Sequence, residues 1–293
     1  RNSLCVPHVY DLTSYVTPGK SSLVTIRVDN RIKEINVGPD SHSITDQTQG
    51  NWNGIVGKIE LQSTPEVFFE DIQVYPDLAG KKALVRMNVR ASSSAKGEIA
   101  LSARSFNTNV NHEIAPVYQT VTVRKGDNPL EMELPMGQNF LTWDEFSPAL
   151  YRLTATLKNG KQIETKQVQF GMREFTINGK WFYVNGRKTM LRGTVENCDF
   201  PLTGYAPMDV ASWERVFRIC RNYGLNHMRF HSFCPPEAAF IAADLVGFYL
   251  QPEGPSWPNH GPKLGNGQPI DKYLMDETIA LTKEYGNYAS YCM

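Results

Sequence analysis

The chain has 293 residues, of which 41% are hydrophobic, and its 30 Lys and Arg balance 30 Asp and Glu to give a formal net charge of zero. This composition excludes a largely disordered chain, which would combine low hydrophobicity with high net charge. Nucleic acid is not an expected partner, because the two signs of charge interleave along the sequence. No apolar run reaches the roughly 20 residues that a membrane-spanning helix needs.

Residues 1–64 show short alternating apolar runs, at 23–28 and 55–61, separated by turn residues. This pattern predicts strands. The amide-rich segment TDQTQGNWNG at 45–54, which contains a single tryptophan, precedes the second run.

The next region, 65–170, has longer strand patterns. They predict seven strands and therefore a β-sandwich. The expected strands span residues 68–74, 82–89, 98–105, 120–123, 130–134, 150–157 and 162–170. Asn159-Gly160 lies between the last two and predicts a type I′ hairpin turn, because both residues accept positive φ.

After Gly171 the pattern alternates between strands and helices. Strands are expected at 189–194, 225–231 and 248–251, and helices at 209–223, 235–246 and 271–285, with Asp209 as an N-cap and Gly224 and Gly247 as stops. Such β-α units predict a parallel sheet, either a closed barrel or a doubly wound fold.

In a β/α barrel the chemistry lies at the carboxyl ends of the strands. The residues near the carboxyl ends of the three expected strands are polar, which is typical of a polar-ligand pocket, and the alternative is that they are solvated loop residues. Trp257 and Trp52 could supply aromatic faces for a sugar. The polar candidates are Arg192, Glu196, Asn197 and Asp199; Arg229, His231 and Ser232; Glu253, Asn259 and His260. No phosphate-binding loop and no metal-ligand spacing is present, so no cofactor is predicted.

Several motifs resemble glycoside hydrolase family 2. FGMREF at 170–175, FYVNGRK at 182–188 and LRG at 191–193 are similar to the entry of its barrel, and NHMRFHS at 226–232 and GFYLQPE at 247–253 to its second and third barrel strands. SPALY at 147–151 resembles its immunoglobulin-like domain and QGNWNGI at 49–55 the end of its jelly roll. The resemblance implies a multidomain β plus α/β fold: part of a jelly-roll sugar-binding domain at 1–64, an immunoglobulin-like β-sandwich at 65–170 and the N-terminal half of a (β/α)8 TIM barrel at 171–293.

The resemblance also implies an activity, the retaining hydrolysis of β-glycosides such as β-galactosides or β-glucuronides. Retention needs two carboxyl groups about 5 to 5.5 Å apart. In the family the acid/base glutamate follows the fourth barrel strand, which would begin here near Ser290. We therefore expect both catalytic glutamates after Met293 and no catalysis by this chain itself. The alternative is a local acid/base pair of Glu196 and Glu253.

By the same resemblance, Arg229 and His231 would bind the sugar at subsite −1, and Asn197 and Asp199 would line its rim. Glu253 would support the pocket or a bound Mg²⁺ or Na⁺ ion, although no spacing signals such an ion. The substrate-binding set is completed by Arg192, Trp257, Trp52 and Asn51. Asn197 stands where better-known galactosidases have histidine, which leaves the sugar open.

The expected partner is a β-linked carbohydrate, and an open half barrel predicts self-association through its unpaired strand edge. Two other functions stay open, a non-catalytic carbohydrate-binding or scaffold protein and an adaptor that uses the sandwich for protein contacts. Residues 1–11 show no signal-peptide pattern. A periplasmic or extracellular location is implied by the resemblance alone.

Overall fold

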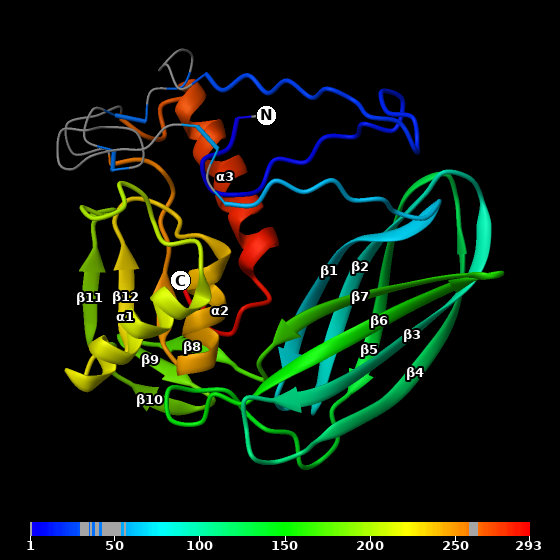
Figure 1. The fold of residues 1–293 in the computed structure, drawn as a ribbon. Coiled ribbons are helices and arrows are strands. Elements are labelled where there is room, and N and C mark those ends of the chain that lie inside the picture. The colour runs from blue at the N-terminus through cyan, green and yellow to red at the C-terminus, as the bar shows by residue number, and fades with distance from the viewer. Residues whose placement is uncertain are drawn as a thin grey trace.

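The computed structural model describes residues 2–29, 35, 37–38, 41–42, 54–55, 57–257 and 263–293. Asn51, Trp52, Asn259 and His260 lie outside these ranges. Figure 1 shows a β-rich half built from β1–β7 beside a mixed half that contains all three helices.

All seven strands expected between residues 65 and 170 are present. They form two antiparallel sheets, one of order β1-β2-β5 and one of order β4-β3-β6-β7. The strands are β1 Val67–Asp77, β2 Lys82–Ala91, β3 Ala95–Phe106, β4 Glu113–Val123, β5 Gly126–Pro135, β6 Leu150–Asn159 and β7 Gln162–Phe170.

The two sheets share one hydrophobic core because their strands alternate buried and exposed residues. In β2, for example, Ala83, Val85, Met87 and Val89 are all buried, and they join residues of β3 and β6 in the same cluster. Tyr151 stacks on Phe170 at 5.6 Å between ring centroids and closes this core near the start of the mixed half.

The hairpin between β6 and β7 differs from the prediction by one residue. Asn159 still pairs with Gln162, so the two central turn residues are Gly160 and Lys161. Gly160 has a φ of +58°, whereas Asn159 is not among the residues with positive φ. The prediction of Asn-Gly at the centre of a type I′ turn is therefore wrong, because the strand pairing extends through Asn159.

The mixed half begins with a small antiparallel sheet of β8 Phe175–Asn178, β9 Trp181–Val184 and β10 Arg187–Thr189. A parallel sheet follows, made of β11 Gly193–Glu196, β12 His227–Phe230 and β13 Tyr249–Gln251. Helices α1 Val210–Asn222 and α2 Glu237–Val246 connect these strands, and α3 Pro269–Tyr285 follows β13. Trp213 and Phe217 of α1 pack with Phe240 of α2 and Phe230 of β12 in a second core.

Helix boundaries follow the expected signals. The carboxylate of Asp209 accepts from the N–H of Ser212 and caps α1, and α2 ends at Gly247, which has a φ of +76°. The first parallel strand is shifted, however: it begins at Gly193, and residues 187–189 pair instead with β9.

The strands expected near the amino terminus are not observed. The described residues before β1 contain no strand, although residues 23–28 have the alternating pattern, and Leu23 is 95% exposed. A strand requires a pairing partner, and in the described residues none lies beside this segment. Further along the amino-terminal region, Val37 packs on Ile270 and Tyr273 of α3. Among the described helices, none has the length and apolar character to cross a membrane.

Candidate functional site

The carboxyl end of the parallel sheet holds a linked trio of charged and polar side chains. Arg229 lies in β12, where it pairs with Gln251 of β13. Its Nε donates to Oε1 of Glu253, which lies just beyond β13. Arg229 Nη2 lies 3.0 Å from His231 Nδ1, which lies 3.1 Å from Glu253 Oε2. The parallel register explains the meeting, because neighbouring strands end at the same edge.

This trio is partly open to solvent. The side chain of Arg229 is 41% exposed, and those of Glu253 and His231 are 22% and 16% exposed. A guanidinium carries five N–H donors. Since only part of this fork faces Glu253 and His231, Arg229 retains donors for the hydroxyl or carboxylate oxygens of a ligand.

An aromatic group adjoins the trio. The ring of Trp257 lies 5.1 Å from that of His231, and His42 lies 4.8 Å from His231 and 5.4 Å from Trp257. His42 was not among the candidates from the sequence. It lies more than 180 residues before His231, in a region without helical or strand periodicity, so only the fold reveals it.

The segment that carries His42 is tied to the loop after β13. Ser41 Oγ donates to Pro255 O at 3.0 Å, and Ser256 Oγ donates to Val37 O at 3.1 Å. Together with the packing of Val37 on α3, these bonds place Val37, Ser41 and His42 at the carboxyl end of the parallel sheet.

The loop after β11 borders the same end of the sheet. Asn197 and Asp199 are exposed there, and the N–H of Asp199 donates to Glu196 Oε1 at 3.0 Å. Glu196 pairs in register with Phe230, so its side chain lies on the helix-covered face, opposite to Arg229. The Glu196–Glu253 acid/base pair is therefore not supported by this geometry.

Burial dominates the electrostatics of Glu196 and raises the pKa of its carboxyl to about 7, against the lowering effect of the backbone N–H groups of Asp199, Cys198 and Asn197. Within the part of the chain that the structure describes, no hydrogen-bond partner reaches its buried Oε2. Glu196 thus organises the turn that presents Asn197 and Asp199.

A buried histidine lies deeper in β12. His227 is in register with Gly193, and a Cβ at that glycine would lie 2.5 Å from His227 Nδ1. The glycine of the LRG motif thus leaves room for the imidazole. Burial lowers the pKa of His227.

The structure does not bring Arg192 to this site. Because β11 begins at Gly193, Arg192 precedes the strand and lies at the opposite, amino end of the sheet. Its Nη2 donates to Glu145 Oε2 at 2.8 Å and its Nε to Gly224 O at 2.7 Å. Its expected position beyond the strand is therefore wrong, and Asn51 and Trp52 lie outside the described residues.

A metal ion at Glu253 does not fit the arrangement. One carboxylate oxygen accepts from Arg229 Nε and the other lies 3.1 Å from His231 Nδ1, so both already have a protein partner. Among the described side chains, no group of three or more His, Cys, Asp or Glu is placed to hold a metal.

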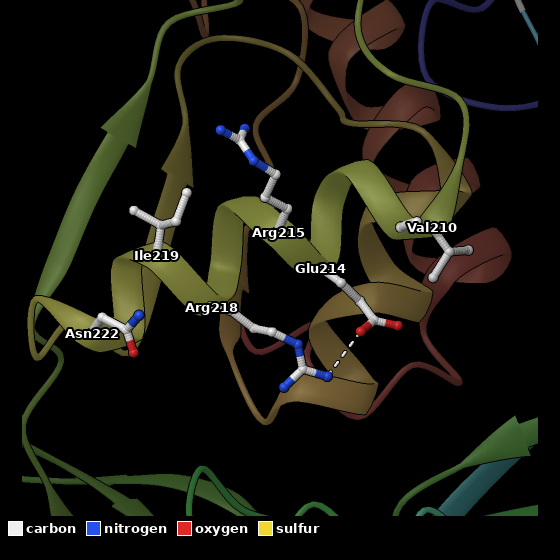
Figure 2. Close-up of a pocket in the computed structure, with 7 residues that line it drawn as sticks. Val210, Glu214, Arg215, Arg218, Ile219 and Asn222 are labelled. Atoms are coloured by element: carbon white, nitrogen blue, oxygen red, sulfur yellow. Dashed lines mark hydrogen bonds and ion pairs between the residues drawn. The ribbon is translucent and has the colours of Figure 1, made fainter.

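A shallow depression elsewhere has no comparable chemistry. Figure 2 shows its lining along one helix, α1, where Arg218 pairs with Glu214 at 2.8 Å. All lining residues come from that helix, namely Val210, Ala211, Glu214, Arg215, Arg218, Ile219 and Asn222. Because these residues all project from one helix, they do not converge on a ligand from several directions, and the depression is not a candidate binding site.

Comparisons with known proteins agree with the strand, helix and motif pattern. The family model for glycosyl hydrolases family 2 matches residues 67–173, from β1 to the entry of the mixed half. A β-galactosidase from Thermoanaerobacter pseudethanolicus is 25% identical over 279 residues, which are 93% of this chain. These matches support a relationship to glycosyl hydrolase family 2.

Other matches cover most of the chain as well. A putative β-glucuronidase from Formosa agariphila is 24% identical over 87% of it. A β-galacturonidase structure from Eisenbergiella tayi, bound to galacturonate, superimposes with a TM-score of 0.67 at 18% identity, over 90% of this chain and 45% of that one. A family 2 structure from Bacteroides cellulosilyticus gives 0.63 at 22% identity, over 78% and 31%.

The chain spans 36% and 30% of the length of the two curated relatives. The structural likenesses, at these identities, establish a shared fold. They place the mostly β architecture with the family 2 enzymes.

Proposed function

We propose that this chain forms the sugar-binding part of a retaining family 2 β-glycosidase, which cleaves O-glycosidic bonds of β-galactosides or β-uronides. The observation that carries the proposal is the Arg229–His231–Glu253 trio beside Trp257, at the carboxyl end of a parallel sheet. That end is where β/α barrels bind their substrates. The relatives named β-galactosidase and putative β-glucuronidase support the same class of substrate.

The finer architecture belongs to this proposal. We assign the two antiparallel sheets as the immunoglobulin-like domain and β11–β13 with their helices as the first half of a (β/α)8 barrel. The order of elements supports the assignment, since three parallel strands are each followed by a helix or a helix-bearing connection. The jelly-roll assignment of residues 1–64 stays a prediction from the motif at 49–55.

In the proposed site, Arg229 donates to ring hydroxyls or to a uronate carboxylate, and Trp257 provides an apolar face for the C–H groups of the sugar. Asn197 and Asp199 contact the outer hydroxyls from the loop that Glu196 organises. Trp52 and Asn51 keep their predicted place as further sugar contacts.

The trio binds and orients but does no chemistry. Glu253 contacts Arg229 and His231, and a retaining mechanism needs a second carboxyl group about 5 to 5.5 Å away, which Glu196 on the opposite face of the sheet does not supply. Glu196 instead accepts from the N–H of Asp199 in the turn that follows β11. We therefore assign neither carboxylate a catalytic role, and the names of the relatives do not favour a non-catalytic scaffold as the function of the whole protein.

The test is to titrate the chain with methyl β-D-galactoside, methyl β-D-glucuronide and methyl β-D-galacturonide, followed by nuclear magnetic resonance. We expect millimolar binding of at least one, weakened in Arg229→Ala. Absence of binding to all three would refute the sugar site. Turnover of nitrophenyl glycosides that disappears in Glu253→Gln would refute the non-chemical role of Glu253.

A further inference from the structure

We infer that His42 is a positioning residue of the sugar site: packed against both His231 and Trp257, it makes the amino-terminal segment a structural part of that site. The inference rests on the proposed function for the nature of the ligand. The placement of His42 itself rests on contacts alone.

His42 joins two parts of the site that belong to different strand loops. Its ring centroid is 4.8 Å from that of His231, which follows β12, and 5.4 Å from that of Trp257, which follows β13. These distances fall within the range of favourable ring packing. The three rings therefore contact one another mutually, and each restricts the rotation of the other two.

Burial decides between direct contact and positioning. His42 is 5% exposed, whereas His231 and Trp257 are only partly buried. A ring that is almost fully covered offers little surface to a ligand, so His42 acts through its neighbours. Its effect reaches the charged trio, because the ring it packs on, His231, contacts both Arg229 and Glu253.

Two described residues that precede His42, Val37 and Ser41, are fastened to neighbouring parts of the site. Ser41 Oγ donates to Pro255 O in a buried hydrogen bond, and Val37 O accepts from Ser256 Oγ. Val37 is 3% exposed and packs on Ile270 and Tyr273. Val37 and Ser41 are thus attached both to the loop that carries Trp257 and to α3, the helix that follows this loop.

The experiment uses the full chain with isotope-labelled histidine, whose six residues give few signals. The variants are His42→Ala, which removes the ring, and His42→Phe, which keeps a ring of similar size. His8→Ala is the matched control, because His8 lies in the same amino-terminal region but is exposed. For each variant we would record the imidazole signal of His231, assigned with His231→Gln, and the affinity for the methyl β-glycoside that binds the unaltered chain most tightly.

We expect His42→Ala to shift the His231 signal and to weaken glycoside binding about tenfold, while His42→Phe stays within about threefold and His8→Ala changes neither. An unchanged His231 signal in His42→Ala would overturn the inference, whether or not any glycoside binds. A loss in His42→Phe as large as in His42→Ala would also overturn it, because ring packing would then not be the cause. If the signal shifts but the unaltered chain binds no glycoside, the proposed function fails and the positioning contact stands.

Discussion

The two ends of the parallel sheet each carry an arginine–glutamate pair, but the pairs differ in burial and in what surrounds them. At the amino end, the side chain of Glu145 is 6% exposed, while that of Arg192 is 44% exposed, and Glu145 accepts from Arg192 and from Asn226 Nδ2 at 3.0 Å. At the carboxyl end, the side chains of Arg229 and Glu253 are 41% and 22% exposed and adjoin partly buried aromatic rings.

The difference indicates which polar cluster can bind a ligand. At the amino end the donors are directed to protein acceptors: Arg192 also bonds Gly224 O, and Arg221 Nη1 donates to Glu145 O and Val246 O. Such a network fastens the mixed half to the linker before β6. At the carboxyl end Glu253 is more open to solvent than Glu145, and the ring of Trp257 lies beside His231, so a sugar would meet polar and aromatic groups together.

The largest expected effect tests the amino end. Glu145→Ala leaves Asn226, which is buried, and Arg192 without their shared acceptor, and we expect unfolding free energy to fall by about 3 to 4 kcal/mol. Urea denaturation of the variant and the unaltered chain measures it. A loss below about 1 kcal/mol would show that the amino-end network does not stabilise the fold as we describe.

The second effect is a pH dependence at the carboxyl end. The pKa of Glu196 is raised to about 7 in the folded chain from 4.5, so the folded state holds this proton more tightly than the unfolded state. The stabilisation that this tighter proton binding gives the folded state is fully present below about pH 4.5 and is lost as the pH rises through 7. The free energy of unfolding therefore falls by at most about 3 kcal/mol over this range.

The substitution Glu196→Gln should remove this part of the pH dependence. Urea midpoints measured from pH 5 to 8 would then fall less steeply in the variant than in the unaltered chain. Parallel slopes for Glu196→Gln and the unaltered chain would contradict the assignment.

A third prediction separates binding from stability. Glu253→Gln weakens the orientation of Arg229 and His231, and we expect glycoside affinity to fall about tenfold, equivalent to about 1.4 kcal/mol. Because the trio is partly solvated, the unfolding free energy should change by less than about 1 kcal/mol. A large loss of stability with unchanged affinity would reverse the contrast between the two ends.

The sequence predicted much of this arrangement because the relevant signals are local. Alternating apolar residues fixed all seven strands between residues 65 and 170, and Asp209 and Gly247 marked helix ends. Arg229, His231 and Glu253 could be grouped because each lies within two residues of the end of a parallel strand.

The misses concern properties that depend on distant partners. Arg192 was misplaced because residues 187–189 pair with β9, which moves the start of β11 to Gly193. The alternating residues 23–28 form no strand in the described structure because no strand there pairs with them. His42 had no local signal at all, since its role comes from contacts with Trp257 and His231.

The smallest expected effect concerns the depression along α1, whose lining residues all belong to that helix. Glu214→Ala removes an exposed i,i+4 pair with Arg218, worth about 0.3 to 0.5 kcal/mol, and should leave glycoside affinity unchanged. Urea denaturation and the glycoside titration measure both quantities on the same sample. If affinity fell with Glu214→Ala, ligand binding would not be confined to the strand ends, and the contrast between an open carboxyl end and a closed amino end would no longer locate the site. If both stay as expected, the depression is a feature of one helix surface, because a binding site needs groups that converge from several elements.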